Sequence, residues 1–149
     1  MQISWTPAEA FKDIARGDAT AEEFLSVLYC WVHVRDDLID KDKAVAPETA
    51  AGLDFSILST FAKNPFFQKH RDFLLPVLMV GALAWVASED RKNSPEVLAR
   101  IEGQVLKSQY VDVFLAVAFL AGGWGHAVAM SRKYRAYNFD VEPTKTLDN

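Results

Sequence analysis

Apolar residues recur along most of this chain at spacings of three, four and seven, the period of helices with one buried face. The stretch Thr20–Lys43 follows this period most fully, and Glu23, three residues after Thr20, completes the pattern of a capping box. No segment alternates apolar and polar residues for long enough to predict a strand. The pattern predicts an all-α protein, a compact single-domain bundle of about five to six helices. Residues 1–136 would form the bundle and residues 137–149 a loose tail.

Start and stop signals divide the chain into these helices. Thr6 and Glu9, on either side of Pro7, form a second capping-box pattern, and a glycine ends that short helix at residue 17. Pro76 lies inside a long apolar segment, where the missing backbone donor predicts a kink. The predicted helices are residues 7–17, 20–43, 47–64, 66–90, 95–121 and 126–135.

One face of the helix predicted for residues 95–121 carries Asp112 among apolar neighbours. Helical spacing places six residues on this face: Ile101, Val105, Ser108, Asp112, Leu115 and Phe119. Four of the six are apolar, so we expect the face to point into the core, where a carboxylate must be paired, coordinated or protonated. Asp112 would then meet His33 or Arg35, or supply part of a metal site. The alternative is that Asp112 lies in solvent on a narrow polar stripe.

Four carboxylates, those of Asp36, Asp37, Asp40 and Asp42, lie at the end of the helix predicted for residues 20–43. Acidic side chains are unfavourable at a helix C-terminus, and they repel one another at spacings of three and four. Asp36 or Asp37 shares a helix face with Asp40, and closely spaced carboxylate oxygens suit a hard cation such as Mg²⁺. The sequence therefore predicts a magnesium site here; a solvated acidic helix end is the alternative.

The string Asp36-Asp37-Leu38-Ile39-Asp40 has the form DDxxD and resembles the first aspartate-rich motif of the all-α isoprenoid synthases, including the squalene and phytoene synthase branch. The resemblance covers these five residues and the helix that carries them. It implies a reduced synthase-like bundle in which Asp36, Asp37 and Asp40 bind a diphosphate through Mg²⁺. Those synthases are longer and carry a second metal motif on a later helix. The nearest acidic candidates for it here are Ser88-Glu89-Asp90, Glu102 and Asp112, and none has the family's spacing.

Composition narrows the possible partners. The chain has 149 residues, half of them hydrophobic, and a net charge of −4. Residues 1–50 hold 5 Lys/Arg and 10 Asp/Glu, whereas residues 51–149 hold 11 and 10, so the acidity belongs to the half with the aspartates. The chain has no basic face that would track a phosphate backbone, so nucleic acid is not an expected partner. The one cysteine, Cys30, lies in an apolar helix, where a buried thiol is expected.

Two uncharged runs raise the question of a membrane. Phe73–Ala87 has 15 residues and contains a proline, and Val113–Met130 has 18 and contains three glycines and a histidine. A spanning helix needs about 20 apolar residues, so we interpret both runs as core helices of a bundle. The N-terminal residues do not form a secretory signal, and a cytoplasmic protein is expected.

Two functional hypotheses remain. The first is a non-catalytic helical interaction or accessory protein, typical of a phage or mobile element, that acts through its surface, as a homodimer or with another protein. The second is a Mg²⁺-dependent enzyme acting on a diphosphate ester through Asp36, Asp37 and Asp40, with Asp112 from a facing helix.

Overall fold

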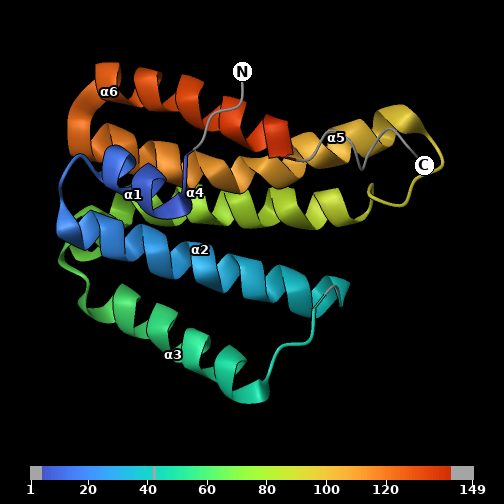
Figure 1. Ribbon diagram of the computed structural model, residues 1–149, viewed down its shortest axis with the longest axis horizontal. Coiled ribbons are helices and arrows are strands. Elements are labelled where there is room, and N and C mark those ends of the chain that lie inside the picture. The colour runs from blue at the N-terminus through green and yellow to red at the C-terminus, as the bar shows by residue number, and fades with distance from the viewer. Residues whose placement is uncertain (1–4, 42, 142–149) are drawn as a thin grey trace.

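All regular secondary structure in the described part of the chain is helical in the computed structural model, which confirms the all-α prediction (Figure 1). The structure describes residues 5–41 and 43–141, and for residues 111 and 136–141 it describes the backbone alone. The helices are α1 (Pro7–Ala15), α2 (Ala19–Asp40), α3 (Pro47–Lys63), α4 (Pro65–Glu89), α5 (Val97–Lys107), a 3₁₀ helix η1 (Ser108–Tyr110) and α6 (Val111–Val141).

Local signals set most helix starts correctly. The Thr6 hydroxyl accepts a hydrogen bond from the Glu9 backbone N–H and the Glu9 carboxylate accepts one from the Thr6 backbone N–H, which confirms that capping box. The capping box expected at Thr20 is wrong. The Asp18 carboxylate caps α2 instead, because it accepts hydrogen bonds from two backbone N–H groups of the first turn. The helix of α4 continues through Pro76.

The core lies where α1, α2, α4 and α6 pack together. Its largest fully buried side chains come from these four helices: Ile14, Phe24, Leu25, Leu74, Val113, Phe114 and Val117. Phe114 is at its centre, with its ring stacked on Phe11 at 5.9 Å and on Tyr134 at 5.6 Å between centroids. Cys30 lies outside this core on the exposed side of α2, so the expectation of a buried thiol is wrong.

The helix predicted for residues 95–121 is interrupted. The chain forms α5, then the 3₁₀ helix η1, and only then the first arm of α6, residues 111–122. Gly123, with φ 78° and ψ −172°, then reverses the chain, and the second arm of α6 returns along the first (Figure 1). Glycine adopts this positive φ without the steric cost that a Cβ imposes. The second arm continues to Val141 and so includes the first five residues of the predicted tail, and residues 142–149 lie outside the described residues.

The interruption also overturns the face predicted for Asp112. Val113, Phe114 and Val117 point into the core from the first arm of α6, whereas Ile101, on the predicted face, is exposed. A periodic pattern identifies residues that share a face only while the helix is continuous. The break at η1 rotates the two halves relative to each other, so the predicted face does not exist as one surface.

Candidate functional site

The C-terminal ends of α2 and α4 bring three carboxylates together. Asp36 and Asp40 lie one turn apart on α2, and Glu89 is the last residue of α4. One carboxylate oxygen from each lies within 4.8 Å of the others. Three oxygen ligands at this separation are the hard donor set that Mg²⁺ or Ca²⁺ prefers. We call Asp36, Asp40 and Glu89 the acidic triad.

Two lysines already neutralise most of the charge of the acidic triad. The Lys92 ammonium, just after α4, donates to both Asp40 and Glu89, and the Lys107 ammonium donates to Asp36 at 3.1 Å. The hydrogen bond to Asp40, followed by the one to Glu89, raises the pKa of Lys92 above that of a free lysine. The triad with its lysines therefore links α2, α4 and α5 electrostatically. A divalent cation would fit the donor set only by displacing Lys92.

The triad differs from the DDxxD prediction at one position. Among the described residues, the group of carboxylates close enough to share a cation includes Asp36 and Asp40 but not Asp37. Glu89 takes the third place. The sequence placed Glu89 among the nearest acidic candidates for a second motif, but no spacing signal singled it out. Only the packing of α4 against α2 brings it to the site.

Asp112 lies apart from the acidic triad. Its carboxylate accepts a hydrogen bond from Arg135 at 2.6 Å, an ion pair between the two arms of α6, with both side chains almost half exposed. The expected partners are engaged elsewhere. Arg35 pairs with Asp54 at 2.7 Å, and the His33 ring Nδ1 lies 3.1 Å from the backbone oxygen of Tyr29. The expectation that Asp112 pairs with Arg35 or His33 is therefore wrong.

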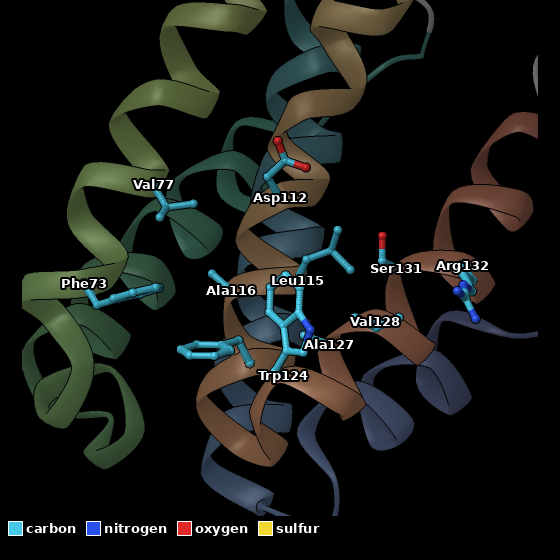
Figure 2. A pocket seen from close by; sticks show the side chains of 11 residues that line it. Phe73, Val77, Asp112, Leu115, Ala116, Trp124, Ala127, Val128, Ser131 and Arg132 are labelled. Carbon is cyan, nitrogen blue, oxygen red and sulfur yellow. The ribbon is translucent and has the colours of Figure 1, made fainter.

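Asp112 lines the rim of an open cavity of about 490 Å³ between α4 and the two arms of α6 (Figure 2). The wall is mainly apolar and includes Phe73 and Val77 from α4 and Phe119 and Trp124 from α6. Asp112 and Arg135 satisfy each other's charge across the two arms of α6. Within the described lining, Asp112, Ser131 and Arg132 are the polar residues, so the cavity offers mainly apolar volume.

Large apolar side chains are exposed along the outer face of α4. Leu75, Met79, Leu83 and Val86 follow one another at spacings of four, four and three, and Val80 flanks them. Together with Phe73, these side chains are 46% to 61% exposed. We call Leu75, Met79, Val80, Leu83 and Val86 the α4 outer face.

A second exposed apolar stripe lies on α5. Val97, Leu98, Ile101 and Val105 are 42% to 67% exposed, and we call them the α5 stripe. Scattered exposed apolar residues are normal on protein surfaces, whereas contiguous patches mark sites of interaction. The candidate sites in the described part of the chain are therefore the acidic triad, the cavity and these two apolar surfaces.

No known protein family matches the chain, and neither a curated protein nor a solved structure matches it.

Proposed function

We propose that this chain is a non-catalytic helical interaction protein that binds another protein through the α4 outer face. The observation that carries the proposal is that this face presents five large apolar side chains, each about half exposed, along a single helix. The segment Phe73–Ala87 contains no charged residue that would favour solvation of the face. Burying such side chains is worth roughly 25 cal/mol for each Å² removed from water, so a complementary apolar surface would bind here.

The spacing of the face indicates what kind of surface fits. Leu75, Met79, Leu83 and Val86 lie along one ridge of α4, and a partner helix or apolar groove can pack against such a ridge. Methionine in the middle of the ridge favours adaptable packing. An amphipathic helix of another protein is therefore the partner that the face fits best.

A membrane is the competing partner for the same surface. In the described part of the chain, two helical segments are long and apolar enough to cross a bilayer by length and composition alone: Pro65–Glu89, with 22% of its most apolar window buried, and Val97–Arg135, with 28% buried. The second segment is broken at η1 and reversed at Gly123, and the uncharged parts of the two α6 arms, residues 113–122 and 124–131, span only about 15 Å and 12 Å at 1.5 Å per residue. The uncharged part of α4 spans about 22 Å, less than the ~30 Å hydrocarbon core. These lengths favour a protein partner.

A photo-activated cross-linking residue at position 79, introduced in the cells that make the protein, tests the proposal. We expect protein adducts from position 79 that disappear when Leu83→Asp is added. The matched control is position 58 on α3, where Leu58 is at least as exposed as Met79 but lies off the α4 outer face. Adducts to lipid alone would indicate that the α4 outer face binds a membrane and not a protein. Equal adducts from positions 79 and 58, or none from either, would contradict the proposal.

The acidic triad supports a second candidate, a Mg²⁺-dependent enzyme acting on a diphosphate ester. Its test is thermal unfolding in millimolar Mg²⁺, because an ion that binds only the folded state raises Tm by mass action. The geometry predicts that Asp36→Asn and Asp40→Asn each abolish the rise and that Asp37→Asn leaves it intact. Loss of the response in Asp37→Asn as well would favour the DDxxD arrangement over the triad. An unchanged wild-type Tm would exclude metal binding under those conditions.

A further inference from the structure

The open cavity of about 490 Å³ has walls from three helical segments. α4 contributes Phe73 and Val77, and the two arms of α6 contribute the rest of the described lining (Figure 2). Sites for small molecules in proteins measure about 300–1,000 Å³ and combine mainly apolar walls with a few polar groups. The cavity fits this description, because Asp112, Ser131 and Arg132 are the polar residues among its otherwise apolar lining.

Contacts with α1 hold the second arm of α6 away from α4. The His126 ring Nε2 lies 3.0 Å from the backbone oxygen of Ile14. Nearer the C-terminus, the Lys133 ammonium donates a hydrogen bond to Asp13 at 2.7 Å. Closing the cavity would pull the second arm off α1 and break both contacts. The cavity is therefore a preformed feature of the fold.

The chain reversal at Gly123 gives the cavity an apolar end and a polar end. Phe119 and Trp124 lie within four residues of Gly123, at the closed end of the two arms. Ser131 and Arg132 lie eight and nine residues after Gly123 along the second arm. Figure 2 shows both of them on the far side of the cavity from α4. At 1.5 Å per residue, the two ends are about 12 Å apart.

The polar end carries an uncompensated positive charge. Asp112 is paired with Arg135, whereas Arg132 is exposed and no acidic side chain in the described part of the chain pairs with it. A guanidinium group binds a carboxylate through two parallel hydrogen bonds, and the neighbouring Ser131 hydroxyl is a further donor. An anionic head group therefore fits the polar end, and a hydrocarbon chain fits the apolar end.

We propose that the cavity binds a fatty carboxylate of medium length. Its carboxylate binds Arg132 and Ser131, and its alkyl chain lies against Phe119 and Trp124. The separation of about 12 Å between the two ends matches the length of extended decanoate. Because the cavity is open, part of the alkyl chain stays in water and the affinity is modest. The cavity differs from the α4 outer face, so the inference does not rest on the proposed function.

Trp124 provides the readout, because its side chain is 75% exposed and an alkyl chain beside it would exclude water. Decanoate, titrated below its micelle concentration, should shift the tryptophan emission to shorter wavelength and reduce its quenching by acrylamide. Trp124→Phe should lose this spectral change, while calorimetry still detects binding. Decyltrimethylammonium has the same chain with the opposite charge, and it should bind at least fivefold more weakly than decanoate.

Two pairs of variants locate the ligand. Arg132→Gln should weaken decanoate binding by about fivefold, the upper range for an exposed ion pair, whereas Lys63→Gln, at the exposed end of α3, should leave it unchanged. Val128→Asp places a carboxylate in the wall of the cavity and should weaken binding by about tenfold or more. Ala129→Asp is its control, because Ala129 is exposed and lies outside the lining. Circular dichroism checks that all four variants fold.

Four results would overturn the proposal. They are the absence of a saturable response to decanoate, equal binding of decyltrimethylammonium, an unchanged affinity in Arg132→Gln, and equal losses in Val128→Asp and Ala129→Asp. Binding to phosphatidylglycerol vesicles without a response to decanoate would assign the surface to a membrane and would also overturn it. Leu83→Asp, on the α4 outer face, should leave decanoate binding unchanged, so failure of the proposed function and failure of this inference are distinguishable.

Discussion

Replacing Lys92 with Met tests whether the lysines hold the acidic triad together. The Lys92 ammonium donates to both Asp40 and Glu89, and it is 37% exposed, whereas its partners are 15% and 21% exposed. Methionine keeps most of the apolar length of the side chain and removes only the charge. The variant therefore leaves three carboxylates close together with Lys107 as their remaining cation.

The loss of stability in Lys92→Met depends on how exposed the ion pairs of Lys92 with Asp40 and Glu89 are. Ion pairs open to solvent contribute about 0.2–1 kcal/mol each, and two pairs at the upper end of that range give roughly 1–2 kcal/mol. For a chain of this length, that is a fall in Tm of roughly 3–8 °C. The assay is equilibrium urea unfolding at low and high salt. The stability difference between wild type and Lys92→Met should shrink at high salt, because salt screens both the ion pairs of wild type and the repulsion among the carboxylates in the variant. Lys63→Met, at the exposed end of α3, is the control and should change little.

The pH dependence has a definite sign. Hydrogen bonds to Asp40 and Glu89 raise the pKa of Lys92 in the folded state above its value in the unfolded chain. The contribution of Lys92 to stability is therefore fully present below the unfolded value of about 10.4 and is lost as pH rises through the folded value. The difference in the free energy of unfolding between Lys92→Met and wild type should be constant from pH 6 to 9 and should narrow only in strongly alkaline solution.

The same variant should reveal the metal-binding capacity of the triad. Without the ammonium group between Asp40 and Glu89, millimolar Mg²⁺ should raise the Tm of Lys92→Met more than that of wild type. Adding Glu89→Gln should remove this extra response. If Lys92→Met unfolds at the same urea concentration as wild type at both salt concentrations, the lysine does not stabilise the triad and the reasoning fails.

Three further predictions concern the rest of the fold. Phe114→Ala should cost about 3–5 kcal/mol in urea unfolding, because its ring is fully buried at the centre of the core; a cost below 1 kcal/mol would show that the site is loosely packed. Gly123→Ala should lower the free energy of unfolding by about 1–2 kcal/mol, because φ is +78° at this position. Gly125→Ala should be neutral or stabilising, because the Cβ that alanine adds there meets open space. Equal effects of the two changes on Tm would argue against the chain reversal at Gly123. A hydrogen bond from Lys133 lowers the pKa of Asp13, so the stability that the charged Asp13 provides is present above pH 4 and lost as pH falls. Asp13→Asn should therefore be less stable than wild type by up to ~1 kcal/mol at pH 7 and as stable as wild type near pH 2. An equal loss of stability at both pH values would contradict this cause.

The sequence by itself determined the fold class and most of the helix starts. The capping box at Thr6 and the proline at position 47 act within one turn of a helix, so their effects can be read from neighbouring residues. Asp18 shows the limit of that approach, because this residue, two positions before the expected cap at Thr20, accepts the hydrogen bonds that start α2. The carboxylates of Asp36 and Asp40 were also identified from their spacing on one helix.

Only the tertiary structure decided which residues complete each candidate site. Glu89 reaches the acidic triad because α4 ends beside α2, and Asp112 pairs with Arg135 because Gly123 reverses the chain between them. The apolar period placed Ile101 and Val105 on one side of α5 but could not show that this side faces solvent. A helical period fixes the relative angles of side chains about the helix axis, whereas the direction in which the helix faces depends on contacts with segments far away in the sequence.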